Sequence, residues 1–486
     1  MKRNIIKIYA IIPILCITLF SCDSYLELEP QDSLIQQEFW QNKEQVSAAL
    51  AGCYASMNQS GFTDRVLLWG ELRGDMLVSL RAGNDQNNML KNFMFPSNGF
   101  TNWSTLYKTI NHCNLVLTYA DQAQVNDLSF TEQELRRIKA EAITIRSLVY
   151  SILVKNFREV PLILTATADT DTDFYPAKNT EDEIIAQIIS DLEAAVNDLN
   201  LGFAQSPAHD KGKMTKGAAL AILADIYLWD EQYDNCIDAT TRLVNLNKYN
   251  LVDGANWFND IFFEGNSDEG IFELQFSDIN ATLRNAFQVG NPTYAPFSGI
   301  FELYNEFPDD VRGNFATYGM FQNTVFKYAG VDATGVYRGA DQYYNTFIFY
   351  RYADVLLMQA EAYILSTTNK DLNKAYALIN QVHERAVGTP LEQITTEGEL
   401  LNALLLERQK ELAFEGKRWY DLLRFAKRND FENQYLILDL AAVKAGPDDY
   451  EQILSYFSEK ESYYLPIYLN EVNLNPNLIQ NPYYEN

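Results

Sequence analysis

The residues of this sequence best suited to metal chemistry form a short acidic run. In DTDTDF, Asp169, Asp171 and Asp173 alternate with other residues and offer carboxylate oxygens, the ligands that Ca²⁺ prefers. An EF-hand loop would need glycine at its sixth position and glutamate at its twelfth, where Phe174 and Thr180 stand. We therefore interpret the run as a solvated acidic loop, with an adventitious Ca²⁺ as the alternative, and we expect no cofactor.

The sequence contains no zinc motif and no catalytic motif. The three histidines are far apart, and none stands in an H-E-x-x-H pattern. Neither a nucleophile elbow nor a phosphate-binding loop is found. A glycosidase needs only two carboxylates about 5 to 9.5 Å apart, and 65 acidic residues offer many such pairs. The residues alone therefore leave hydrolysis open.

The residues that precede Cys22 indicate its chemistry. Three basic residues and the apolar run 8–20 precede it, and this run is too short to cross a bilayer but is typical of a cleaved signal. The sequence LFSC resembles the lipobox of bacterial lipoproteins, in which the cysteine becomes the first residue and is acylated. We predict a signal peptide at 1–21 and lipid attachment at Cys22. Secretory cleavage beside an incidental cysteine is the alternative.

The composition fits a large globular protein. The 486 residues are 47% apolar and 13% aromatic, which is enough for a sizeable core. The net charge of −27 becomes −30 when the three basic residues of the signal leave. Such a charge repels nucleic acid and anionic lipid and favours a neutral or cationic ligand. The widely spaced cysteines Cys53, Cys113 and Cys236 indicate single buried thiols rather than disulfides.

Capped amphipathic helices recur along most of the chain. Thr131 and Glu134 form a predicted capping box ahead of apolar residues spaced by three and four, in a helix that should end before Pro161. The same pattern begins at Thr180 and at Thr396. The spacing therefore predicts a mostly α protein.

Two segments look like tetratricopeptide-type helical hairpins. Residues 216–246 and 351–386 each have small residues and a tyrosine on a first helix, then a short turn and a second helix with an apolar face. Each hairpin has one apolar face that needs a neighbour, so we expect the hairpins to stack.

Two regions lack helical spacing. Gly, Asn and aromatic residues alternate irregularly over about 58–102 and 253–345, and residues 270–276 alternate like a short strand. Long aromatic loops on a helical scaffold are where binding sites tend to lie.

Several segments, taken in order, resemble the SusD/RagB family of outer-membrane glycan-binding lipoproteins nearly from end to end. They are CDSYLELEPQDSL, WSTLYKTINHCNLVL, AEAITIRSLVYSILVKNFREVPL, KGAALAILADIYL, RYADVLLMQAEA, ERQKELAFEGKRWYDLLRF and YLPIYLNEVNLNPNLIQNPYY. The chain departs from the family pattern at Arg158 and Tyr483, where Gly is usual, and at Tyr468, where Pro is usual.

We expect most of these motifs to be structural. In ELAFEGKRWYD, Glu411, Glu415, Arg418 and Asp421 recur at three and four positions and predict ion pairs along a helix. We expect three charged residues of the second hairpin to tie helices together: Arg351, Asp354 and Glu361.

The resemblance implies a single domain at 22–486, with an N-terminal helical and loop part at about 22–215 and a C-terminal part at about 216–486 that contains the hairpins and the loop insertion 253–345. It implies a mostly α fold, in which a tetratricopeptide-like scaffold carries a large irregular part with short strands.

The resemblance also implies that the protein binds oligosaccharides or polysaccharide without catalysis and delivers them to a SusC-type TonB-dependent transporter. The protein would be lipid-anchored in the outer membrane and face the exterior. The alternatives are peptide or glycoprotein capture by the same scaffold, or a lipoprotein glycoside hydrolase.

The resemblance further implies a sugar site on the loops of one face. Sugars stack their flat C–H faces on exposed rings and bond their hydroxyls to polar side chains, and both loop regions contain that mixture. We nominate as ligand-binding residues Asp75, Arg81, Asn84, Phe95, Phe100, Asn102, Tyr294, Phe297, Tyr304, Tyr318 and Tyr343. Trp69 and Trp103 lie in helical or motif contexts and are expected in the core.

Overall fold

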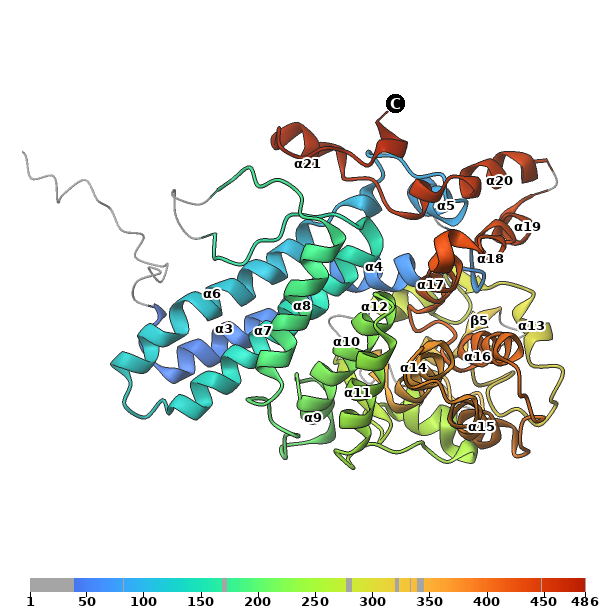
Figure 1. Cartoon of the computed structure of the whole chain (residues 1–486), viewed down its shortest axis with the longest axis horizontal. Coiled ribbons are helices and arrows are strands. Elements are labelled where there is room, and N and C mark those ends of the chain that lie inside the picture. Colours follow the sequence, from blue (N-terminus) through green and yellow to red (C-terminus); the bar gives the residue numbers. More distant parts are fainter. Residues whose placement is uncertain are drawn as a thin grey trace, which may run out of the picture.

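Helices carry most of the chain, as the residue spacing predicts. The computed structural model describes residues 39–81, 83–167, 173–276, 282–319, 323–332, 334–338, 345–446 and 448–485. Long helices occupy the left of Figure 1, and paired helices with the loop-rich insertion occupy the lower right. The predicted fold class, mostly α with helical pairs and short strands, is confirmed.

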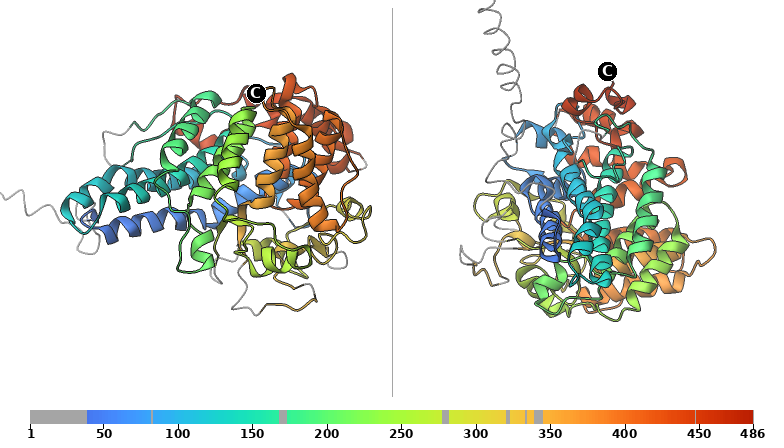
Figure 2. Two further views of the ribbon diagram at one scale, coloured as in Figure 1. Left: turned by 60° about the horizontal axis from the view of Figure 1, so that its bottom comes forward. Right: turned by 90° about the vertical axis from the view of Figure 1, so that its left-hand side faces the viewer.

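The N-terminal part is built on five helices. They are α3 (Lys43–Met57), α4 (Ser60–Glu71), α6 (Ser104–Asn126), α7 (Glu132–Phe157) and α8 (Glu181–Ala195). α3 packs on α6, α6 on α7, and α7 on α8, and the left view of Figure 2 shows α3 and α6 running side by side along the long axis. The capping boxes predicted at Thr131 and Thr180 are both formed, and α7 ends before Pro161.

Two helical hairpins follow, also as predicted. They are α10 (Lys216–Trp229) with α11 (Tyr233–Val244), and α14 (Tyr352–Leu365) with α15 (Leu372–Val387). The hairpins are far apart in sequence, but α11 packs on α14, so they stack in space. α16 (Glu397–Glu411) packs on α14 and α15 and extends the layer.

The strands are short and form three antiparallel pairs within the described residues. β1 (Leu77–Ser79) pairs with β3 (Tyr294–Pro296), β2 (Gly270–Leu274) with β6 (Phe347–Arg351), and β4 (Tyr318–Gly319) with β5 (Thr324–Val325). β2 lies within the strand predicted at 270–276. Every residue of β2 and β6 is buried, so this pair belongs to the core.

The remaining helical segments are mostly short. They are α5 (Asn84–Leu90), η2 (Gly99–Thr101), α9 (Pro207–Lys211), η3 (Gly254–Asn256), η4 (Asn259–Glu264), α12 (Thr282–Phe287), α13 (Ile300–Leu303), η6 (Phe326–Tyr328), α17 (Arg418–Phe431), α18 (Tyr435–Leu438), α19 (Leu440–Lys444), α20 (Tyr450–Ser458), η8 (Lys460–Tyr463), α21 (Leu469–Leu474) and η9 (Pro482–Tyr484). At the top of Figure 1, α5 lies beside α20 although they come from opposite halves of the sequence.

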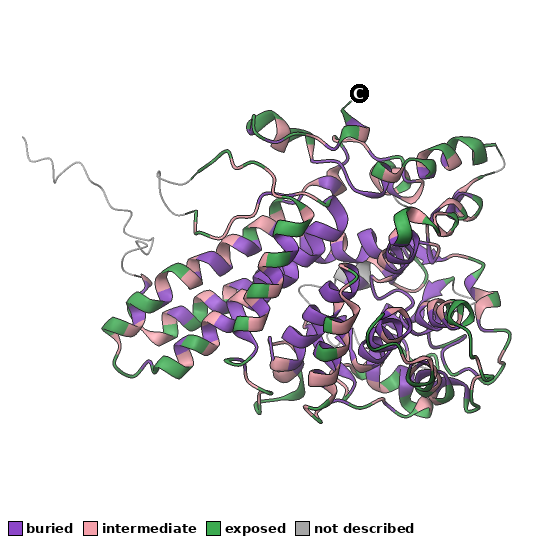
Figure 3. Cartoon of the chain, viewed as in Figure 1, coloured by how far each residue is buried: buried purple, intermediate pink, exposed green. Residues whose placement is uncertain are grey.

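The helices turn their buried faces toward one another, and Figure 3 shows exposed residues gathered at the rim and at the left-hand tip. Trp69 and Trp103 are 0% and 3% exposed, which confirms that they belong to the core. Cys53, Cys113 and Cys236 are buried and free, as their spacing predicts.

The segment ELAFEGKRWYD departs from the helical pattern that its spacing predicts. α16 ends at Glu411 and α17 begins at Arg418, and between them Gly416 has a φ of 75°. A Cβ on Gly70 of α4 would lie 2.1 Å from the carbonyl oxygen of Gly416, so the two backbones are in contact. The prediction of ion pairs along one helix is therefore wrong, because the helix breaks to make this contact. Apart from an Asp421–Arg424 pair within α17, the charged residues of the segment pair with other elements.

Some predictions lie outside the described residues: the signal peptide 1–21, Cys22, Asp169, Asp171 and Tyr343. Asp173 is described, and its carboxylate accepts from the backbone N–H of Tyr175 at 2.9 Å. In the part of the chain that the structure describes, no helix has the length and apolar character needed to cross a membrane. The same residues contain no group of three or more acidic, His or Cys side chains placed to hold a metal ion.

Candidate ligand-binding face

The two irregular regions singled out in the sequence meet in the fold. β1 comes from the first region and β3 from the second, and Val78 lies opposite Ala295 at the centre of their pairing. The N–H of Leu80 donates to the carbonyl oxygen of Thr293 at 2.9 Å and continues the pairing beyond the strands. We call the surface formed by β1, β3, α5 and residues 91–102 the loop face.

Side-chain bonds to backbone hold the loop 91–102 in place. The guanidinium of Arg65 on α4 donates to the carbonyl oxygens of Asn102 at 2.6 Å and Gly99 at 3.0 Å. The carboxylate of Asp85 accepts from the N–H of Gly99 at 2.8 Å, and the amide of Asn98 donates to the Asp85 carbonyl at 2.9 Å. A rigid helix therefore positions a loop that has little regular structure of its own.

Three aromatic rings, those of Phe93, Phe95 and Tyr456, pack together beside α5. We call these three rings the aromatic platform. The rings of Phe93 and Tyr456 are stacked, with centres 4.6 Å apart and planes 17° apart. Phe95 meets Phe93 edge-on, with centres 4.7 Å apart. Phe93 is 40% exposed, so part of its ring faces solvent. A ring held by its neighbours offers a flat apolar surface and loses little entropy when a ligand stacks on it.

Sequence reasoning named Phe95 but missed the other two rings of the platform. Phe93 could have been found, because Phe93 and Phe95 flank the buried Met94 as alternate residues of an extended segment do. No local pattern points to Tyr456, which α20 brings to the platform from near the C-terminus.

The nominated residues that reach the surface lie in α5, in the loop 91–102, or just after β1 and β3. Arg81 and Asn84 are exposed and can bond to ligand hydroxyls. Four more are partly buried: Phe95, Phe100, Asn102 and Phe297.

Three nominated residues of the loop regions are buried: Tyr294, Tyr304 and Tyr318. Asp75 is also partly buried. The Asp75 carboxylate is paired with the guanidinium of Arg418 at 2.7 Å, and the Tyr304 hydroxyl donates to a backbone carbonyl of α16 at 2.8 Å. Burial removes the three tyrosines from the surface on which a sugar would stack, and the ion pair with Arg418 engages the carboxylate of Asp75. In this structure these four side chains therefore support the face. Ligand binding stays a prediction for every nominated residue.

Asp64 of α4 is a polar group near the loop face that sequence reasoning missed. Burial raises the pKa of its carboxyl to about 6, although the positive charge of Arg65 acts in the opposite direction. The pKa of the Tyr294 phenol on β3 is raised, chiefly by burial and secondly by the negative charge of Asp64. Asp64 and Tyr294 are therefore near each other. The carboxylate of Asp64 makes no hydrogen bond to another described residue, so its oxygens can accept from a ligand.

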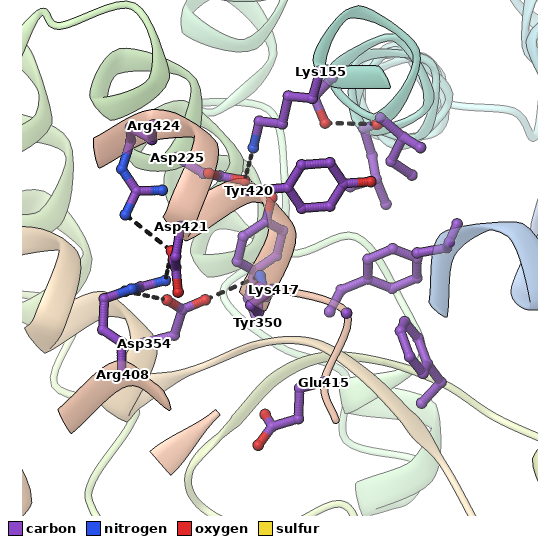
Figure 4. A pocket seen from close by; sticks show the side chains of 17 residues that line it. Lys155, Asp225, Tyr350, Asp354, Arg408, Glu415, Lys417, Tyr420, Asp421 and Arg424 are labelled. Carbon is purple, nitrogen blue, oxygen red and sulfur yellow. Dashed lines mark hydrogen bonds and ion pairs between the residues drawn. The ribbon is translucent and has the colours of Figure 1, made fainter. Parts of the chain in front are cut away.

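A small cavity inside the scaffold is lined by charged side chains from five helices and from the segment between α16 and α17, together with aromatic side chains of β6 (Figure 4). Its volume is about 50 Å³. Lys155 pairs with Asp225 at 2.6 Å, and Arg408 pairs with Asp354 at 2.9 Å. Burial alone would raise the pKa of Asp225, but the ammonium groups of Lys155 and Lys417 hold it below its ordinary value. The charges are paired with one another and the volume suits a few water molecules, so this cavity belongs to the scaffold.

Further buried ion pairs connect the motif ERQKELAFEGKRWYDLLRF to the end of β6 and to the second hairpin. Arg351 bonds to the carboxylate of Glu415 at 2.8 Å, and Arg424 bonds to Glu361 at 2.8 Å. With the Asp354 pair, these contacts confirm that the three charged residues of the hairpin tie helices together. The most recognisable motif is therefore structural, and through Gly416 it also supports α4, which positions the loop face.

Comparison with known proteins agrees with this architecture. Residues 24–228 match a family model described as "Starch-binding associating with outer membrane", and residues 269–484 match the model of the SusD family. The chain belongs to the SusD family. β1 lies in the first matched segment and β3 in the second, so the loop face of this SusD-family protein forms where the two segments meet.

Individual relatives support the same assignment. A SusD-like protein of Formosa agariphila is 25% identical over 464 residues, which cover 84% of this chain and 88% of that protein. A SusD superfamily protein from Bacteroides vulgatus has a TM-score of 0.76 at 23% identity, with 91% of this chain and 99% of that chain covered. A laminarin binding SusD-like protein has a TM-score of 0.69 at 20% identity, with 91% and 100% covered. The two solved structures show that the fold is shared.

Proposed function

We propose that this SusD-family protein is a surface-exposed outer-membrane lipoprotein that binds oligosaccharides or polysaccharide and delivers them to a SusC-type TonB-dependent transporter. The loop face is the observation that carries the proposal. Two regions far apart in sequence are joined by β1 and β3. The first of them forms the aromatic platform together with Tyr456 of α20, and it also carries the exposed polar side chains of Arg81 and Asn84.

The chemistry of the face suits a neutral sugar. Phe93 offers a ring for the C–H face of a pyranose, while Arg81 and Asn84 donate to its oxygen atoms and Asp64 accepts from its hydroxyls. A neutral glycan is not repelled by a chain of net charge −27.

The contacts of Asp85, an acidic residue of the loop face, favour capture without hydrolysis. A glycosidase needs two carboxylates about 5 to 9.5 Å apart that both reach the sugar. The side chain of Asp85 instead holds the loop through the N–H of Gly99. Peptide or glycoprotein capture by the same scaffold is the alternative function.

The proposal also includes a lipid anchor on Cys22 and a transporter as the partner. A lipid on Cys22 would hold the protein on the outer membrane and let it cover the entrance of a transporter barrel, where captured glycan is concentrated. The motif LFSC and the description of the matched family model support this location.

Isothermal titration calorimetry tests the proposal. Laminarin-derived and starch-derived oligosaccharides come first, because a structural neighbour and the family model name these glycans. Each mixture is afterwards analysed for cleavage products. Binding without products is expected. New reducing ends would establish a hydrolase instead, and binding of peptides alone would favour the alternative.

Two variants locate the site. Phe93→Ala removes a ring that contributes on the order of 1 kcal/mol by stacking, so the glycan Kd should rise roughly fivefold to tenfold. Leu128→Ala is the matched control, because Leu128 is 98% exposed and lies in the turn between α6 and α7, far from α5 in Figure 1. Equal affinities of the two variants would exclude the platform as the binding surface.

A further inference from the structure

A second hollow lies between α15, α16 and the loop that connects them. Its volume is about 480 Å³, which is within the range of small-molecule sites. Its apolar walls come from five residues: Phe307, Leu391, Ile394, Ala403 and Leu406. None of its lining residues belongs to the loop face, so the hollow is a separate feature of the molecule.

His383 of α15 lines this hollow and has an unused hydrogen-bonding atom. The residue is 2% exposed, and its Nδ1 lies 3.3 Å from the Oε2 of Glu407. The other oxygen of Glu407 accepts from Arg312 at 2.5 Å. Burial would raise the pKa of Glu407, but Arg312 and then His383 hold it below its ordinary value, so the carboxylate is ionised.

An ionised Glu407 fixes the tautomer of the imidazole. We assign the proton to Nδ1, where it faces the carboxylate, which leaves Nε2 with a lone pair. Nε2 has no hydrogen-bond partner among the described residues. A buried acceptor without a partner is unfavourable, so a ligand that donates a hydrogen bond would gain by binding here.

The charges around the hollow are mostly negative. Four glutamates line it, against a single lysine: Glu306, Glu392, Glu399, Glu407 and Lys410. The ammonium of Lys410 lies 3.9 Å from the carboxylate of Glu306, which offsets its charge, and 5.3 Å from the ring centre of Phe307. Carboxylates and an aromatic face both attract organic cations.

We propose that the hollow between α15 and α16 is a second binding site, for a small molecule that carries a primary ammonium group. The ammonium donates a hydrogen bond to His383 Nε2, the glutamates balance its charge, and the apolar walls contact the body of the ligand. An amino sugar and an alkylamine share this chemistry. The site goes beyond the proposed glycan capture and does not depend on it.

Saturation-transfer NMR and calorimetry on the purified protein test the site with three probes: glucosamine, N-acetylglucosamine and cadaverine. Binding of glucosamine but not of N-acetylglucosamine would support the site and indicate an amino sugar. Binding of cadaverine alone would support it and indicate an alkylamine. If neither amine binds, or if N-acetylglucosamine binds as well as glucosamine, the proposal is overturned.

Variants of α16 show whether the bound amine lies in this hollow. Ala403 lines it and is partly buried, so Ala403→Leu should fill the space and weaken amine binding at least tenfold. The neighbouring Asn402 is exposed and does not line the hollow, so Asn402→Leu should leave the Kd unchanged. Glu392→Gln removes an exposed charge without disturbing the core and should weaken binding about threefold. Unchanged amine affinity in Ala403→Leu would exclude this location, whether or not the loop face binds glycan.

Discussion

Replacing Glu71 with glutamine should change the pH dependence of stability. Glu71 lies on α4 and is fully buried, and its Oε1 accepts from the N–H of Gly416 at 2.8 Å and from that of Lys417 at 3.1 Å. Its Oε2 has no partner among the described residues. Burial raises the pKa of this carboxyl to about 8, against the smaller opposite effect of the backbone donors.

The sign and size of the effect follow from this pKa. In the unfolded chain the carboxyl ionises near its ordinary value of 4.5, whereas the folded protein keeps it protonated up to about 8. Between these values the folded state holds more protons, so stability falls as the pH rises. At about 1.4 kcal/mol per pH unit, the free energy of unfolding should fall by roughly 2.5 kcal/mol between pH 5.5 and 7.5 through this group. Glu71→Gln keeps the acceptor and has no titrating proton, so it should avoid this loss.

Urea unfolding at pH 5.5 and 7.5 measures the difference. The quantity of interest is the change in unfolding free energy between the two pH values, compared between wild type and Glu71→Gln. Glu44→Gln is the control, because Glu44 is an exposed glutamate at the start of α3. If the unfolding free energy falls equally in wild type and in Glu71→Gln between the two pH values, Glu71 is not protonated in the folded protein. Burial against the backbone of Gly416 would then not raise the pKa of this carboxyl.

Four further outcomes are expected. Arg351→Met should lower the unfolding free energy in urea by about 3 to 5 kcal/mol, because it removes one of the cations that neutralise a buried cluster of three carboxylates. Gly416→Ala should cost roughly 1 to 2 kcal/mol in the same assay, since its φ of 75° disfavours a side chain, whereas alanine at the exposed Gly398 should cost less. Glycan affinity should weaken as the pH falls below about 6 and the Asp64 carboxylate takes up a proton, and Asp64→Asn should abolish that dependence in calorimetry. Cys22→Ser should release the protein from membranes in cell fractionation, and retention at the wild-type level would contradict lipid anchoring.

The helical scaffold was predictable because its signals are local. Capping boxes such as that of Thr131, apolar residues at spacings of three and four, and small residues at helix contacts all act within one or two turns. The stacking of α11 on α14 also followed from the sequence, since each hairpin leaves an apolar face to cover.

It was less predictable which side chains the loop face exposes, because this depends on contacts with residues far away in the chain. Tyr304 looks like a loop aromatic, but its hydroxyl reaches a backbone carbonyl of α16, so it is buried. Tyr456 looks like an ordinary helix residue until α20 brings it to Phe93. The break at Gly416 was missed because the charged residues on either side keep helical spacing across it.

The pairing of β2 with β6 bears on how this protein can be engineered. Leu274 lies opposite Phe347, so the stretch between these residues begins and ends at one place in the core. Lengthening a loop whose ends are already fixed costs only about 0.6 kcal/mol for each doubling of its length. The stretch that supplies β3 to the loop face can therefore accept insertions in its exposed turns at small cost, as long as its buried contacts with α16, such as those of Tyr304 and Arg312, are kept. One scaffold could in this way present a series of different binding surfaces.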